Sequence, residues 1–87
     1  MDIKQRFSDA LDIPEEIVLD VPVIKIVSNN KIIIENHKGI IEYSKTTVRI
    51  NSRIGIVALK GEDFVIKYIT QDEIILEGEI EVIEFIK

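Results

Sequence analysis

The chain has a single histidine, His37, and it is the first residue to examine for chemistry. A catalytic or metal-binding histidine needs a base, an acid or further ligands, and the sequence offers no cysteine and no second histidine. Nearby Asn36 and Gly39 can take backbone angles that isoleucine cannot, so residues 36–39 indicate a tight turn between two strands. We therefore expect His37 to be a solvent-exposed turn residue.

Serines and carboxylates offer no catalytic pattern either. The serines at 28, 44 and 52 lie in predicted turns without the glycines of a nucleophile elbow. Most acids after residue 40 alternate with apolar residues, which is typical of the solvent-exposed face of a sheet. These acids are Glu42, Glu73, Glu77, Glu79, Glu81 and Glu84. The four glycines are isolated, so no phosphate-binding loop is present. The sequence predicts no catalytic residue, no cofactor, no metal site and no enzyme, with little room for a pocket of about 300 Å³.

Charge is distributed unevenly along the chain. The net charge of −5 has the wrong sign for a general nucleic-acid binder. Bases gather at Lys38, Lys45, Arg49 and Arg53, opposed only by Glu42 within that stretch, whereas residues 72–84 hold six acids and no base. Two interpretations stay open. The segments are neighbours that neutralise each other in one fold, or they meet head to tail between two copies or two proteins.

Composition points to strands, since 31 of the 87 residues are β-branched. Short gaps between the apolar runs make neighbouring strands antiparallel. The expected strands cover residues 23–27, 31–35, 39–43, 47–51, 54–59, 64–69, 73–77 and 79–85. We predict an all-β fold, a small antiparallel β-sandwich of seven or eight short strands. The alternative is a short β-solenoid, because similar segments begin at Ile32, Val48 and Val65, 16 or 17 residues apart.

A short helix is expected before the sheet. Residues 2–11 place Ile3, Phe7, Ala10 and Leu11 on one helical face, and Pro14 ends this pattern. We interpret residues 1–87 as one domain, with the helix and its exit turn in 1–14 and the β body in 18–87. The longest apolar run has six residues, against about 20 for a membrane-spanning helix, so we expect no membrane insertion. We also expect no secretory signal, and the sequence has no cysteine, which together predict a cytoplasmic protein.

Several predicted strands carry apolar residues on both faces, which suggests a partner surface and a homo-oligomer. The outer residues expected to take part are Ile33, Ile40, Val57 and Leu59. His37 and Lys38 are further candidates for contact because a turn would display them. Asn36 and Gly39 are assigned to turn geometry.

Motifs along nearly the whole chain resemble the YabP/YqfC family of bacterial sporulation proteins, and its YqfC branch in particular. The most distinctive motif runs from Ile34 to Ile40 and continues in Glu42-Tyr43. The other matching segments are Ala10–Pro14, Val18–Pro22, Asn51–Gly55 and Gly61–Asp63.

The resemblance implies a non-enzymatic role in endospore formation. It places the protein in the mother cell, at the outer forespore membrane surface, with a membrane-protein partner. The expected function is assembly of the spore envelope, coat or cortex, through protein–protein contacts. The alternative is a small ligand-sensing or regulatory binding module, which a polar cavity near residues 36–38 or Arg53 would favour.

Overall fold

The computed structural model describes residues 20–87, and these form six strands in one antiparallel sheet. The strands are β1 (Val23–Val27), β2 (Lys31–Glu35), β3 (Ile40–Tyr43), β4 (Thr47–Ser52), β5 (Gly55–Ile69) and β6 (Glu73–Ile86). Their order across the sheet is β1-β2-β6-β5-β4-β3. The all-β, antiparallel prediction is confirmed. The helix predicted at residues 2–11 lies outside the described residues.

The prediction of seven or eight strands is wrong because two strands are long. β5 has 15 residues and joins the segments predicted at 54–59 and 64–69, although it begins one residue later, at Gly55. β6 has 14 residues and covers the segments predicted at 73–77 and 79–85. The solenoid alternative is wrong as well, since all pairings of the described strands are antiparallel.

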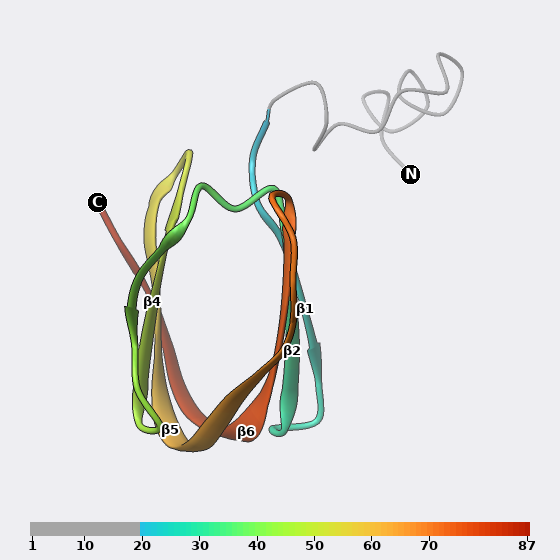
Figure 1. Ribbon diagram of the computed structural model, residues 1–87. Coiled ribbons are helices and arrows are strands. Elements are labelled where there is room, and N and C mark those ends of the chain that lie inside the picture. Colours follow the sequence, from blue (N-terminus) through green and yellow to red (C-terminus); the bar gives the residue numbers. More distant parts are fainter. Residues whose placement is uncertain (1–19) are drawn as a thin grey trace, which may run out of the picture.

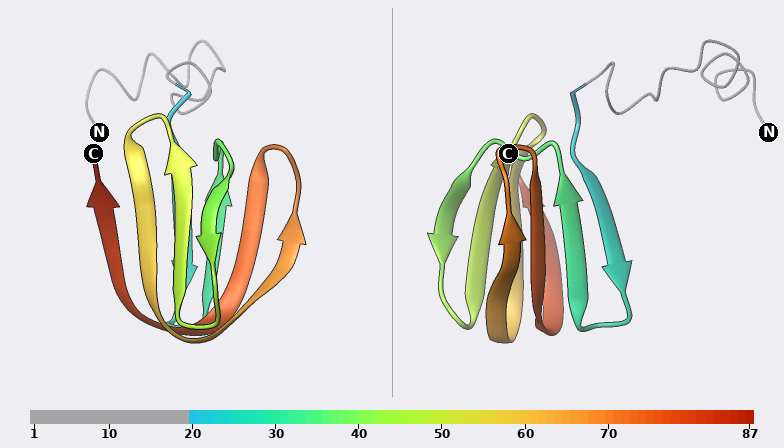
Figure 2. Two further views of the ribbon diagram at one scale, coloured as in Figure 1. Left: turned by 60° about the vertical axis from the view of Figure 1, so that its left-hand side comes forward. Right: turned by 45° about the vertical axis from the view of Figure 1, so that its right-hand side comes forward.

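The sheet doubles back on itself so that its two halves face each other (Figures 1 and 2). β2 pairs with residues 73–77 of β6, and β4 pairs with residues 55–60 of β5. The first half therefore contains β1, β2, residues 73–77 of β6 and residues 65–69 of β5. The second half contains β3, β4, residues 55–60 of β5 and residues 82–86 of β6. Both halves belong to one continuous sheet, in place of the separate sheets of an ordinary sandwich.

The core fills the space between the two halves. The first half contributes Ile32, Ile34, Ile74 and Leu76, and the second half contributes Val48, Ile50, Val57 and Leu59. Phe64 lies in β5 between the residues that pair in the second half (55–60) and those that pair in the first half (65–69), and it is fully buried. Burial of these side chains is what holds the halves together, at about 25 cal/mol for each Å² of apolar surface removed from water.

Two glycines allow β5 and β6 to bend around Phe64. A Cβ on Gly61 would overlap the carbonyl oxygen of Glu79, and a Cβ on Gly78 would lie 2.7 Å from Phe64 Cδ1. Gly78 also has a positive φ of 153°. The absent side chains let the two backbones and the ring approach closely, so the bends depend on glycine at these positions.

The interpretation of residues 31–43 as a hairpin is wrong. β2 is paired on one side with β1 and on the other with β6, so both of its edges are occupied. β3 lies at the far end of the sheet beside β4. Residues 36–39, which we call the crossover, instead carry the chain from the first half to the second across the open mouth of the fold (Figure 1).

We predict that Gly61→Ala lowers the free energy of unfolding by about 3 kcal/mol or more, because its Cβ meets backbone that cannot move alone. Gly39→Ala is the control. Gly39 has a φ of +113°, but no atom lies within 4 Å of the place that its Cβ would take, so this variant should lose only about 1 to 2 kcal/mol through backbone strain. Urea unfolding of both variants measures the difference. Equal losses would contradict the proposed role of Gly61.

Candidate functional site

The crossover holds the most distinctive sequence motif, and its backbone follows the predicted turn chemistry. Asn36 has a φ of 64° and Gly39 a φ of 113°. These are left-handed angles that asparagine and glycine adopt more easily than β-branched residues. Both residues therefore have the backbone geometry that their types led us to expect, although the segment is a crossover and not a hairpin turn.

Backbone hydrogen bonds attach the crossover to both halves of the sheet. Asn36 N–H donates to the carbonyl of Asp72, in the β5–β6 turn of the first half, at 2.7 Å. Lys38 N–H donates to the carbonyl of Asn51 in β4 at 2.7 Å, and Asn51 N–H donates to the carbonyl of Gly39 at 2.8 Å. The crossover therefore ties the open ends of the two halves together, and from here on we call residues 36–39 the strap.

His37 is buried within this strap, with only 6% of its surface exposed, so the expectation of an exposed turn residue is wrong. Its Nε2 lies 2.8 Å from the carbonyl oxygen of Thr70, and its Nδ1 accepts the N–H of Gly39 at 3.0 Å. These partners assign a neutral ring with the proton on Nε2. Both ring nitrogens of His37 therefore have hydrogen-bond partners within the chain.

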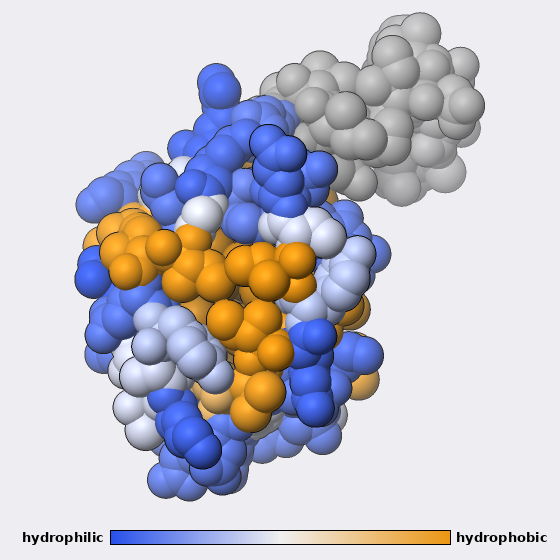
Figure 3. All heavy atoms as spheres, viewed as in Figure 1, coloured by the Kyte–Doolittle hydropathy of each residue, from blue (hydrophilic) through white to orange (hydrophobic). Residues whose placement is uncertain are grey.

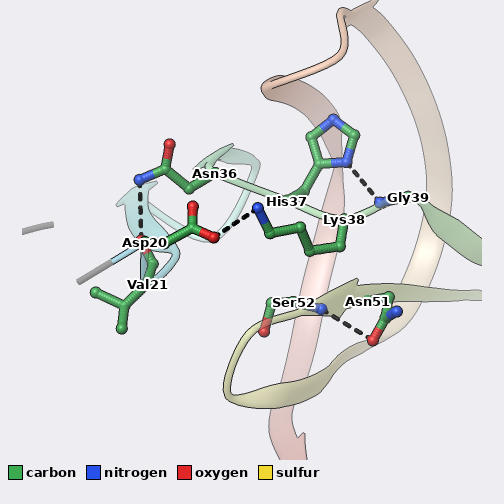
Figure 4. Close-up of polar contacts among 8 residues, drawn as sticks. All are labelled: Asp20, Val21, Asn36, His37, Lys38, Gly39, Asn51 and Ser52. Carbon is green, nitrogen blue, oxygen red and sulfur yellow. Dashed lines mark hydrogen bonds and ion pairs between the residues drawn. The ribbon is translucent and has the colours of Figure 1, made fainter. Parts of the chain in front are cut away.

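Lys38 points away from the core and remains about half exposed. Its Nζ lies 2.8 Å from Asp20 Oδ2, and Asn36 Nδ2 donates to the carbonyl of Val21 at 3.0 Å (Figure 4). These two contacts fix the chain just before β1 against the strap. An exposed ion pair contributes about 0 to 1 kcal/mol, so Lys38 stays a candidate for external contact without being needed for folding.

The buried serine beside the strap has a structural partner. Ser52 Oγ donates to the carbonyl of Gly55 at 2.8 Å, and its N–H donates to Asn51 Oδ1 at 3.1 Å (Figure 4). The first bond spans the β4–β5 turn, and the second joins adjacent residues at the end of β4. The hydroxyl has no base among these partners.

Open hollows occur on the surface formed by residues 20–87, although the short chain led us to expect little room for a pocket. One, of about 420 Å³, is lined by His37, Lys38, Gly39, Gln71 and Asp72. The other, of about 630 Å³, lies at the bends and is lined by Asn29, Asn30, Lys31, Asp63, Glu77, Gly78 and Glu79. Both exceed the roughly 300 Å³ of a small ligand site, and the first lies where a binding module was expected to place its cavity.

The apolar residues expected on the outside are mostly inside. Val57 and Leu59 are fully buried core residues, and Ile33 and Ile40 are partly buried. The exposed large apolar residues are Ile26, Val27, Ile41, Tyr43, Ile54, Val65, Tyr68, Ile69, Val82, Phe85 and Ile86. Because residues 56–59 are apolar on both faces, alternation alone could not show which face turns inward.

Acidic side chains gather at the bends. The carboxylates of Glu62, Glu79 and Glu81 lie within 4.8 Å of one another, and all three residues are exposed. Such groups are common on acidic surfaces without an ion, so this one assigns no metal site by itself. Their grouping was invisible in the sequence because it depends on how β5 and β6 pair.

Comparisons with known proteins identify relatives of the chain. The YabP family model matches residues 19–87. The chain is 38% identical over 85 residues to the uncharacterized protein YqfC of Bacillus subtilis (strain 168), covering 98% of this chain and 91% of that protein. No solved structure matches. Among residues 20–87, no helix has the length and apolar character needed to cross a membrane.

We predict that His37→Ala lowers the free energy of unfolding by about 2 to 4 kcal/mol, because it leaves the Gly39 N–H and the Thr70 carbonyl without their partner. His37→Asn keeps an acceptor for Gly39, and His37→Gln keeps a donor for Thr70, so each should lose less. Lys38→Ala should change stability by under about 1 kcal/mol. Thermal and urea unfolding measure all four variants, and a neutral His37→Ala would refute the role of the His37 side chain in holding the strap.

Proposed function

The chain belongs to the YabP family, and from this premise we propose that it is a non-enzymatic sporulation protein that acts through protein–protein contacts in assembly of the spore envelope, coat or cortex. The family resemblance described from the sequence supports the role in sporulation. The exposed surfaces of the structure support action through protein–protein contacts.

The observation that carries the proposal is the amount of exposed apolar surface on the sheet. Figure 3 shows apolar side chains gathered between the two halves, with polar surface above and below them. Eleven large apolar residues of the described chain are at least 40% exposed. Contiguous apolar surface of this kind on a small protein is typical of sites that bind other proteins.

The chemistry of the strap supports a non-enzymatic role. Both nitrogens of His37 are bonded within the chain, and the Ser52 hydroxyl is bonded to a turn carbonyl. Neither arrangement resembles a nucleophile with an adjacent base. Folding thus explains His37 within the most distinctive motif, and Lys38 stays a candidate for contact. The apolar contacts with other proteins are assigned to other parts of the surface.

The location and partners belong to the same proposal. The protein acts in the mother-cell cytoplasm, at the outer forespore membrane surface, where a membrane protein recruits it. It also forms homo-oligomers. The family resemblance supports the first statement, and the exposed apolar residues support the second.

The hollow beside the strap favours a second candidate, a small ligand-sensing or regulatory module. Its lining brings Lys38 and Asp72, of opposite charge, next to the polar side chain of Gln71. Polar groups that converge in this way can orient a small ligand. This candidate places the functional surface at the strap, away from the apolar residues.

We predict that deletion of the gene in a spore-forming bacterium lowers the yield of heat-resistant spores and that the wild-type gene restores it. Tyr68→Ser, which removes an exposed apolar side chain, should restore less. Its folding is checked by thermal unfolding. Unchanged spore yield after deletion would contradict the proposed function.

The two candidates differ in the expected effect of changing the hollow. Gln71→Ala and Lys38→Ala alter its lining without touching the core. If the protein acts through apolar contacts, both variants restore the spore yield fully. Loss of function in both, with normal folding, would favour the ligand-sensing module.

A further inference from the structure

The folded sheet leaves four strand segments with one unpaired edge. In the first half, β1 pairs with β2 alone and residues 65–69 of β5 pair with β6 alone. In the second half, β3 pairs with β4 alone and residues 82–86 of β6 pair with β5 alone. Among residues 20–87 these four segments, which we call the free edges, are where the sheet can accept another strand.

The free edges are staggered between the halves. β1 and β2 belong to the first half only, whereas β3 and β4 belong to the second half only. At one side of the molecule β3 and β4 extend past β5, and at the other side β1 and β2 extend past β6 (Figure 2). Each side therefore has one projecting half and one recessed half, and the two sides are complementary in shape.

The directions of the outermost strands would also let a second copy extend both halves of the sheet. Each half has four antiparallel strand segments, so its two outermost segments run in opposite directions. A second copy placed alongside in the same orientation continues both halves with antiparallel neighbours. β3 would then meet residues 82–86 of β6, and residues 65–69 of β5 would meet β1 of that copy.

Exposed apolar residues concentrate on the free edges. Of the eleven exposed large apolar residues, all but Ile54 lie on these four segments. β3 carries Ile41 and Tyr43, and the end of β6 carries Val82, Phe85 and Ile86. A contact that joins these edges would remove from water most of the apolar surface that the folded chain leaves exposed.

The wider chain segments around the two edges of the second half differ in net charge. Residues 40–53 hold Lys45, Arg49 and Arg53 against one acid, for a net charge of +2, and residues 79–87 hold three acids against Lys87, for a net charge of −2. Within the described residues, Lys38 and Arg49 form ion pairs with Asp20 and Glu42, not with the acids of 72–84. The two segments do not pair with each other inside one chain. Glu42 compensates Arg49 and Lys60 compensates Glu84 within the chain, so the charges left for a partner are those of the remaining residues.

We propose that copies of this chain associate head to tail, with β3 and residues 65–69 of β5 in one copy adding to residues 82–86 of β6 and to β1 in the next. The inference rests on the proposed action through protein contacts and identifies a second copy as one partner. Such an interface is heterologous, so it generates a closed ring or an open filament.

The test uses one substitution on each side of the contact, in the full chain. Ile41→Glu adds an acid to β3, opposite the acidic end of β6, and Phe85→Glu removes the largest exposed apolar group of β6. Ile54→Glu is the matched control, because Ile54 is exposed to a similar extent (42%, against 48% for Ile41) but lies in a turn outside the free edges. Circular dichroism and thermal unfolding verify that each variant is folded.

Sedimentation velocity and light scattering then measure mass against concentration. The wild type and Ile54→Glu should associate beyond a dimer, and added salt should weaken this association. Ile41→Glu and Phe85→Glu should each weaken it at least about tenfold. A mixture of these two variants should form a 1:1 dimer that grows no further, because each supplies the intact side that the other lacks.

Two results would overturn the proposal. A wild-type chain that stays monomeric at high concentration would show that the free edges do not join copies of this chain. Association of the wild type without a 1:1 dimer in the mixture would indicate a two-fold symmetric contact instead. Either result leaves the proposed sporulation role to the gene-deletion experiment, whose outcome does not depend on self-association.

Discussion

The close packing of Gly61 and Gly78 around Phe64 is the constraint on which the rest of the structure depends. One sheet of six strands can enclose a core only if its two central strands bend, and β5 and β6 bend where side chains are absent. The buried ring of Phe64 fills the space that the glycines leave. β5 and β6 each run through both halves. A substitution that changes the bends would therefore move the two halves apart and open the core between them.

The strap of residues 36–39 closes the opposite end. It carries no regular structure, yet it bonds to the β5–β6 turn on one side and to β4 on the other. His37 holds it in place through both ring nitrogens. The bends and the strap thus fix the halves at their two ends, and the conspicuous histidine of the sequence is explained by folding rather than by chemistry.

The same topology that encloses the core also creates the surface assigned to function. Sharing only β5 and β6 between the halves leaves β1–β2 and β3–β4 on opposite sides of the molecule. The free edges and most exposed apolar residues follow from this stagger. A protein built in this way has interaction surface along its sides, where it can bind strands of other proteins or of its own copies.

The sequence by itself determined the class of the fold, the positions of most turns, the special backbone at Asn36 and Gly39, and the family. These features are local, because β-branched residues favour strands and turn residues favour particular angles wherever they occur. Only the tertiary structure decided that two pairs of predicted strands are continuous, that residues 36–39 cross between halves, that His37 is buried, and that Val57 and Leu59 face inward. Those outcomes depend on which strands become neighbours. When both faces of a strand are apolar, the face that turns inward is set by partners distant in the chain, which no local pattern records.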